Sequence, residues 1–277
     1  DGHDPQAKAY FHGLLELYQA NLIELGSRCM SWVVPDKLDG SLTKSSGATD
    51  GDFDIAYALL LADKQWGSSG EHPDYLGVAK GILENCVLKY DISEKTHRIL
   101  MGDWGKGQNG GVGKPEASRY NESVTRPSDW LLGHLKAFQA ATPEKAKRWD
   151  AAIKETYRLV ETVQSPKTGL FPDFAEDVSG KPQKAVLDLP YVAEDGKKKL
   201  KFLESEHDDA YGWNACRVPW RLAVDYAHYG DPRTEKALGT LNAWSTKLSA
   251  KPAAWPSSIW HGYTLDGEKL DPNDDWS

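Results

Sequence analysis

The sequence lacks any long hydrophobic run, and no stretch approaches the roughly 20 apolar residues that a membrane-spanning helix requires. It also lacks an excess of basic residues. Its 41 acidic and 33 basic residues give a formal net charge of −8, and the two signs are interspersed, so no basic face predicts binding to nucleic acid or anionic lipid. We therefore expect neither nucleic acid nor a membrane among its partners.

Cysteine is scarce as well. Cys29, Cys86 and Cys216 lie far apart, outside any C-x-x-C pair or Cys/His cluster, so the sequence predicts no zinc site, and we expect neither a metal nor another cofactor. One disulfide with a free thiol and three buried thiols are both compatible with this spacing. Buried thiols are favoured because free cysteine is among the most buried residue types. The redox compartment stays open.

Helical hydrophobic spacing recurs along the 277 residues, of which 40% are hydrophobic. This length and composition suit one large domain with a substantial core. Two long segments, 105–126 and 164–209, lack such spacing, and 98–101 is a candidate short strand. Because strands and helices do not alternate, we expect an all-α architecture rather than a parallel sheet. The expected helices are 5–26, 48–66, 75–87, 128–141, 144–163, 213–228 and 232–248.

Carboxylates crowd the start of the segment 48–66, ATDGDFDIAYALLLADKQW. Asp50, Asp52 and Asp54 lie in the first turn, where unpaired N–H groups and the helix dipole favour negative charge. Two apolar stripes follow at the spacing of a buried helix. Rigid placement suits a catalytic acid, although helix capping is the more frequent role of such residues. A calcium loop is excluded because its required glycine and glutamate are missing.

The same segment resembles the signature of glycoside hydrolase family 8. The matching positions are Ala-Thr-Asp-Gly-Asp at 48–52, Ile-Ala at 55–56, Ala62 and Trp66. The resemblance implies a toroid of six helical hairpins, (α/α)6, and inverting hydrolysis of β-1,4-linked polysaccharide. It places Asp50 at the cleavage subsite, where this aspartate helps to hold the sugar and the attacking water.

A second run of carboxylates and aromatics, FLESEHDDAYGWNACRVPW, occupies 202–220. By composition it is a polar loop leading into a helix. In much of family 8 the general base is an aspartate at the position of Asn214, but asparagine cannot accept the proton of water. One subgroup, which includes chitosanases and mixed-linkage glucanases, has this asparagine and takes its base from a glutamate after Phe-Leu. The resemblance therefore implies Glu204 as the base, with Glu206 its nearest competitor.

Aromatic residues fit a sugar-binding cleft, because the apolar face of a pyranose packs on a flat ring. Trp66, Trp149 and Trp244 lie on apolar stripes, so we expect these three in the core. For 125–130 (TRPSDW) and 169–173 (GLFPD), two further landmarks of the family, we expect structural roles. The resemblance implies these substrate-binding residues: Trp32, Trp104, Tyr211, Trp213, Asn214 and Arg217.

The resemblance fails at both ends. The family's general acid is a glutamate in a Ser-Glu-Gly-x-Gly-Tyr-Gly-Met segment, which the sequence does not contain, and the family adds a final helical hairpin where this sequence stops. We therefore expect 1–277 to form a single catalytic domain without its first and last helices, inactive by itself. The complete protein is expected to be a secreted, monomeric endo-glycanase of chitosan or β-glucan. A non-catalytic polysaccharide-binding protein and a polysaccharide lyase are the alternatives.

Overall fold

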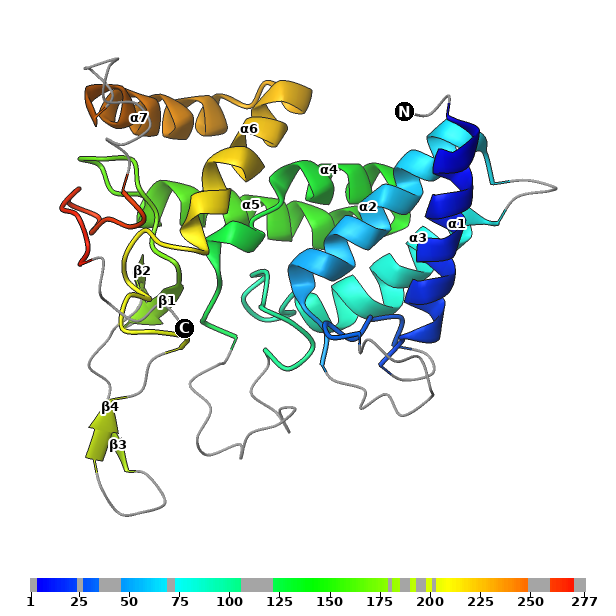
Figure 1. The fold of residues 1–277 in the computed structure, drawn as a ribbon, viewed down its shortest axis with the longest axis horizontal. Coiled ribbons are helices and arrows are strands. Elements are labelled where there is room, and N and C mark those ends of the chain that lie inside the picture. Colours follow the sequence, from blue (N-terminus) through cyan, green and yellow to red (C-terminus); the bar gives the residue numbers. More distant parts are fainter. Residues whose placement is uncertain are drawn as a thin grey trace.

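The protein is described by a computed structural model that covers residues 4–23, 27–34, 46–68, 73–105, 122–178, 181–184, 190–192, 198–200, 203–248 and 260–271. The expected all-α class is confirmed (Figure 1). The α-helices of these residues are α1 (Pro5–Ala20), α2 (Thr49–Trp66), α3 (Tyr75–Ile82), α4 (Leu132–Ala141), α5 (Ala146–Val163), α6 (Val218–Tyr229) and α7 (Pro232–Leu248).

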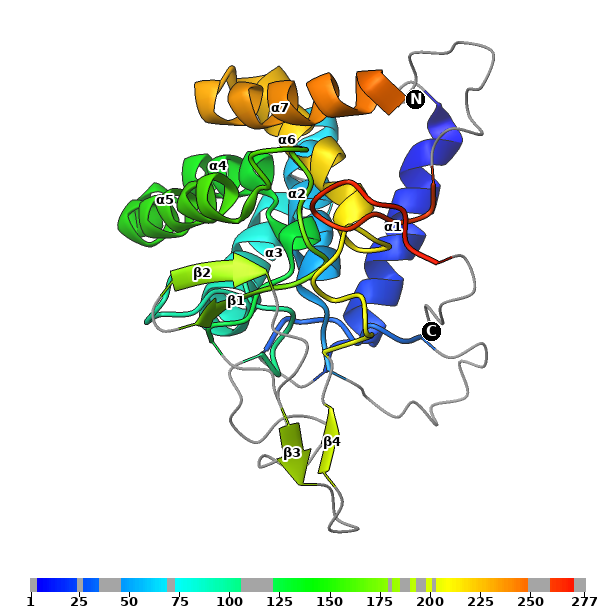
Figure 2. The same cartoon turned by 90° about the vertical axis from the view of Figure 1, so that its left-hand side faces the viewer.

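Consecutive helices pair into hairpins, because α2 packs on α3, α4 on α5, and α6 on α7. Helix α4 also contacts both α2 and α6, while α5 contacts α7. The first helices of these hairpins form a row in which α4 lies between α2 and α6, and α3, α5 and α7 are their partners; Figures 1 and 2 show α7 lying across the top, above α6. This is the two-layer hairpin arrangement of an (α/α)6 toroid.

Aromatic packing joins the two layers. The rings of Phe53 on α2 and Phe138 on α4 meet edge to face at 5.5 Å, and Phe138 lies 5.6 Å from Trp149 on α5. All three side chains are fully buried. Trp149 was expected in the core, and this is confirmed; Trp66 and Trp244, expected there too, are only partly buried. The stack fixes the position of the helix that carries the acid-rich signature.

Several boundaries differ from the sequence-based prediction. The first helix ends at Ala20, and Leu14, which belongs to its apolar stripe by spacing, is 63% exposed. The helix predicted at 75–87 is α-helical only to Ile82 and continues as a π-helix over Leu83–Asp91. Before α4, Pro127–Asp129 form a separate 3₁₀ turn.

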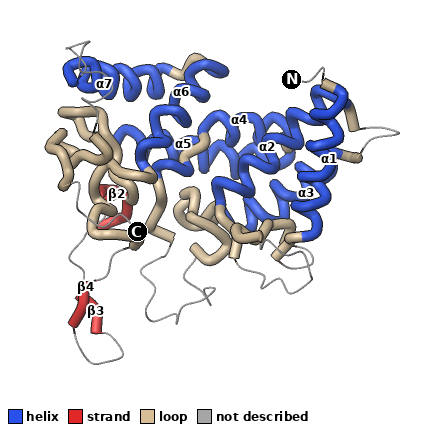
Figure 3. Tube along the Cα trace, viewed as in Figure 1, coloured by secondary structure: helices blue, strands red, loops and turns tan. Residues whose placement is uncertain are grey.

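The described strands form two small antiparallel hairpins, β1 (Ala175–Val178) with β2 (Lys181–Lys184) and β3 (Pro190–Val192) with β4 (Lys198–Leu200). Both lie within 164–209, which was expected to be irregular. The strand suggested at 98–101 amounts to a single bridge between Ile92 and Ile99. Figure 3 shows the strands and most of the described loops on one side of the helical block. Among the described residues, no helix combines the length and apolarity needed to cross a bilayer.

The favoured expectation of three buried thiols is wrong. Cys29 and Cys86 form a disulfide with a Cα–Cα distance of 5.1 Å, within the usual range. Cys216 is a free, exposed thiol. The bridge ties the segment before the signature helix to the π-helix behind it. It depends on packing between segments 57 positions apart, which no local spacing reveals.

Candidate active site

The three acids of the signature point in three different directions. The Asp50 side chain is 22% exposed and accepts a hydrogen bond from Arg217 Nη1 at 3.2 Å. Asp52 is buried and accepts one from the Met30 backbone N–H at 3.0 Å. Asp54 faces His134 and Arg221. Of the three, only Asp50 contacts a residue of the second carboxylate-rich segment, 202–220, through its bond with Arg217.

The loop that carries Glu204 is folded around a buried aspartate. Asp208 accepts hydrogen bonds from the backbone N–H groups of Leu203 at 2.5 Å, Glu204 at 3.1 Å and Ser205 at 2.9 Å. Burial raises the pKa of the Asp208 carboxyl, an effect that these hydrogen bonds oppose. The backbone of Glu204 is therefore fixed from within its own loop, while its side chain stays 46% exposed.

A chain of three hydrogen bonds connects the two carboxylates that the sequence singled out. Asn214 Nδ2 donates to Glu204 Oε2 at 2.8 Å, Arg217 Nη2 donates to Asn214 Oδ1 at 2.8 Å, and Arg217 Nη1 donates to Asp50 Oδ2. The structure thus brings together Asp50, Glu204, Asn214 and Arg217. Glu206 lies instead 3.9 Å from His207 Nε2.

A buried carboxylate holds the turn that presents Asn214. Asp173 Oδ1 accepts from the backbone N–H groups of Gly212 at 3.0 Å and Ala215 at 2.7 Å. Burial raises the pKa of Asp173 to about 6, against the lowering effect of these hydrogen bonds. Asp173 belongs to a landmark that was expected to be structural, and the turn that it supports carries two expected substrate-binding residues, Trp213 and Asn214.

Two expected sugar platforms are open to solvent. Trp213 is 68% exposed and Trp32 67%. Trp104 is partly buried and its Nε1 donates to the Gly47 carbonyl at 3.1 Å, while the Trp32 N–H donates to the Ser46 carbonyl at 3.2 Å. The Trp104 ring and the Trp32 backbone are therefore tied to the residues just before α2. Tyr211 is partly buried and forms a backbone bridge with Tyr263.

The sequence reasoning missed Arg126 and Asp129 at the site. Arg126 Nε donates to Asp129 Oδ2 at 3.0 Å, and its Nη1 lies 3.5 Å from both Glu204 Oε1 and Asn214 Oδ1. Asp129 is fully buried; burial raises its pKa, and Arg126 opposes that rise. The available signal was an Arg-Pro-Ser-Asp turn directly before a helix, which was expected to have only a structural role.

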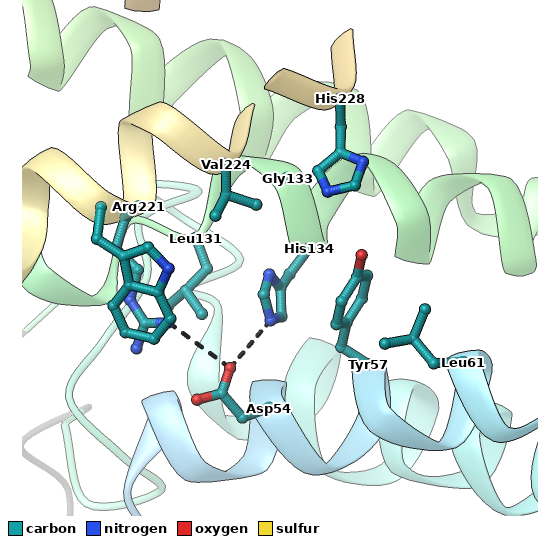
Figure 4. A pocket seen from close by; sticks show the side chains of 10 residues that line it. Asp54, Tyr57, Leu61, Leu131, Gly133, His134, Arg221, Val224 and His228 are labelled. Atoms are coloured by element: carbon teal, nitrogen blue, oxygen red, sulfur yellow. Dashed lines mark hydrogen bonds and ion pairs between the residues drawn. The ribbon is translucent and has the colours of Figure 1, made fainter. Parts of the chain in front are cut away.

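A separate pocket of about 520 Å³ lies between α2, α4 and α6 (Figure 4). Asp54 Oδ1 lies 2.9 Å from His134 Nε2 and 3.7 Å from Arg221 Nη1. The Tyr57 ring stacks on His134 at 4.1 Å, and the walls are otherwise mainly apolar. Glu204 does not line this pocket, which is therefore distinct from the hydrogen-bonded chain above.

Among the described residues, one group has ligand atoms close enough to share a metal ion: Cys29, Asp52, Cys86 and Asp91. Its two sulfurs are joined in the disulfide and offer no thiolate, so the group does not fit a metal site as it stands. Burial raises the pKa of Asp52 to about 7, which the Met30 hydrogen bond opposes.

The helical hairpins place this chain in the (α/α)-toroid class, and the comparisons give the family. A family model described as glycosyl hydrolases family 8 matches residues 4–196. A β-glucanase of Niallia circulans is 38% identical over 269 residues, which cover 96% of this chain and 58% of the relative. An endoglucanase of Bacillus sp. (strain KSM-330) is 36% identical over 275 residues, covering 97% and 51%. This chain belongs to glycoside hydrolase family 8.

A solved structure supports the same family assignment. The apo structure of a β-1,3-1,4-glucanase from Paenibacillus sp. X4 matches with a TM-score of 0.77 and 34% identity, over 99% of this chain and 65% of that one. The chain therefore spans between half and two thirds of the length of these relatives.

Proposed function

We propose that the complete protein is a secreted, monomeric, endo-acting hydrolase of β-1,4-linked glucan that works with inversion of configuration. The chain of hydrogen bonds from Glu204 through Asn214 and Arg217 to Asp50 carries this proposal, because it links two carboxylates of distant segments through two shared side chains. The names of the relatives, β-glucanase, endoglucanase and β-1,3-1,4-glucanase, favour glucan over chitosan as the substrate.

In this proposal Glu204 is the general base. Inversion requires a base that takes a proton from water on one face of the sugar while an acid protonates the leaving oxygen on the other, about 6.5–9.5 Å away. Glu204 Oε2 is occupied by the Asn214 amide, whereas Oε1 has only a loose contact with Arg126, so Oε1 is the oxygen that receives the proton. The general acid is assigned to no residue of this chain.

Asp50 has a positioning role in the same proposal. Its ion pair with Arg217 and its place in the first turn of α2 stabilise the carboxylate, which can then hold the sugar at the cleavage subsite and the attacking water. Trp32 and Trp213, both largely exposed, supply flat apolar faces for neighbouring sugar rings. Asn214, Arg217, Tyr211 and Trp104 complete the proposed substrate-binding set.

The disulfide Cys29–Cys86 supports the secreted assignment, because such bonds persist in oxidising compartments and are rare in the cytosol. The test of function uses the full-length protein with lichenan, carboxymethylcellulose and chitosan. We expect new reducing ends from lichenan, with the product first appearing as the α-anomer by NMR.

Each other outcome identifies a rival. Release from chitosan alone would shift the substrate class, and a β-anomer would reject inversion. Products that absorb in the ultraviolet would indicate a lyase. Tight binding of oligosaccharides without any product would identify a non-catalytic binding protein.

A further inference from the structure

The orientation of the Asn214 side chain follows from its neighbours. Its Oδ1 faces Arg217 Nη2 at 2.8 Å and Arg126 Nη1 at 3.5 Å. A guanidinium has only donors, whereas an amide has one accepting end and one donating end. The amide oxygen must therefore face the two arginines, and the amide nitrogen must face Glu204 Oε2. Asn214 thus passes the effect of two cations on to the carboxylate as a single N–H donor.

Arg126 is held independently of Glu204. Its Nε donates to Asp129 Oδ2 at 3.0 Å, and Asp129 is fully buried. The Arg126 side chain is only 14% exposed, whereas that of Glu204 is 46% exposed. The arginine is therefore the more rigid of the two, and its position does not depend on the acid that it faces.

An amide at position 214 is compatible with an ionised Glu204, whereas a carboxylate there would not be. A carboxylate at 214 would also bind the two arginines, but its second oxygen would then face Glu204 Oε2 at the 2.8 Å that now separates Asn214 Nδ2 from it. Two carboxylates so close cannot both stay ionised near neutral pH. The amide keeps the hydrogen bond to the arginines and replaces repulsion of Glu204 by donation to it.

We propose that Arg126 is a positioning residue for Glu204 that acts through Asn214. Together with Arg217 it fixes the Asn214 amide, so that Oε2 of Glu204 is always occupied and Oε1 is always presented. The 3.5 Å contact of Arg126 with Oε1 itself lies at the outer limit of a hydrogen bond, so it adds charge beside that oxygen without occupying it. This inference rests on the proposed function of Glu204 as base.

A double-mutant cycle in the full-length protein tests the coupling. Arg126→Gln and Asn214→Ala are measured singly and together on lichenan. A base displaced by about 1 Å costs of the order of 10²-fold in rate, so we expect each single variant to lower kcat about 10- to 100-fold. For Arg126→Gln, which is outside the proposed substrate-binding set, KM should stay within about threefold of wild type. Because Arg126 is proposed to act through Asn214, the kcat of the double variant should lie within about threefold of the kcat of the less active single variant.

Three controls make the result decisive. Arg158→Gln breaks an exposed ion pair of the same i, i+3 spacing, to Glu155, and should keep the wild-type kcat. Arg126→Lys keeps the charge without the planar fork and should recover part of the loss. It also covers the case in which Arg126→Gln does not fold, which thermal unfolding will show. Glu204→Gln reports on the base itself.

The outcomes separate the two proposals. If Glu204→Gln retains turnover, the assignment of the base fails, whatever Arg126 does. If Glu204→Gln is inactive while Arg126→Gln has a wild-type kcat, the positioning role alone fails. It also fails if the losses in the double variant multiply, because Arg126 would then act independently of Asn214.

Discussion

Asp50 pairs with Arg217, in the 3₁₀ turn Ala215–Arg217 directly before α6, at 3.2 Å, and one helical turn along, Asp54 pairs with Arg221 on α6, at 3.7 Å. Helix α2 thus makes two ion pairs of the same residue types, one with this turn and one with α6. Their surroundings differ. At the first pair, Arg217 also donates to Asn214, which in turn donates to Glu204. At the second, His134 adds a hydrogen bond at the edge of a mainly apolar pocket.

By this comparison, an acid at the start of a helix is not by itself enough to mark a candidate active site. Both acids belong to the same signature, and each is paired with an arginine, Arg217 directly before α6 and Arg221 within it. What sets Asp50 apart is a second carboxylate supplied by a segment more than 150 positions away in the sequence. The predictions below compare the two pairs under matched substitutions, each measured on the full-length protein.

The first comparison is between the acids. We expect Asp50→Asn to lower kcat on lichenan of the order of 10²-fold, because positioning of sugar and water is lost with little change in shape. Asp54→Asn should stay within about threefold of wild type. Equal losses of kcat in the two variants would mean that Asp54, at the pocket, contributes to turnover as much as Asp50. The distinction between the two pairs would then be wrong.

The second comparison is between the arginines. Arg217→Lys keeps a positive charge but cannot bind Asp50, Asn214 and Ser128 with one planar group, so we expect a loss of about 10-fold in kcat. For Arg221→Lys we expect wild-type kcat with a lower thermal midpoint, because its side chain is only 5% exposed. A drop in kcat for Arg221→Lys as large as that for Arg217→Lys would contradict the comparison.

Asp52 lies between the two pairs and gives a prediction about pH. Its folded-state pKa of about 7 is above the ordinary 3.8, so between these values the folded protein holds a proton that the unfolded chain has released. The free energy of unfolding should therefore fall as pH rises from about 4 to 7, by at most about 1.4 kcal/mol per pH unit from this group.

Asp52→Asn removes that contribution because an amide does not titrate, and its oxygen can still accept the hydrogen bond from the Met30 N–H. Urea unfolding at pH 5 and pH 8 should show a smaller difference in the variant than in the wild type. Part of the difference should remain, because Asp173 also has a raised pKa, of about 6. Asp150→Asn, an exposed change on α5, is the control and should follow the wild type. An unchanged difference in Asp52→Asn would rule out Asp52 as its source.

The smallest expected effect is on stability at the second pair. The Asp54 side chain is 50% exposed, and an ion pair open to solvent contributes about 0.2–1 kcal/mol. Chemical unfolding of Asp54→Asn should therefore show a loss of less than about 1 kcal/mol. A loss of several kcal/mol would show that the pair holds α2, α4 and α6 together rather than merely lining the pocket.

Local patterns in the sequence predicted the helices, because apolar spacing is a property of each segment alone. Asp50, Glu204, Asn214 and Arg217 were named through family resemblance, and the structure brings them together. The contacts that could not be predicted are long-range. Arg126 meets Glu204 across 78 positions, and the disulfide joins residues 57 apart. Such pairs form only when segments distant in the sequence pack together, so neither residue carries a local sign of its partner.

The assignment of Glu204 as base is tested most directly by a matched pair of variants in the same loop. Glu204→Gln and Glu206→Gln differ by two positions, but only Glu204 accepts from Asn214. We predict that Glu204→Gln loses turnover of lichenan by a factor of 10³ or so, within the range for a missing general base, and binds a cello-oligosaccharide with a Kd near that of the wild type. Glu206→Gln should stay active. Near-wild-type turnover in Glu204→Gln, with loss in Glu206→Gln, would contradict the account.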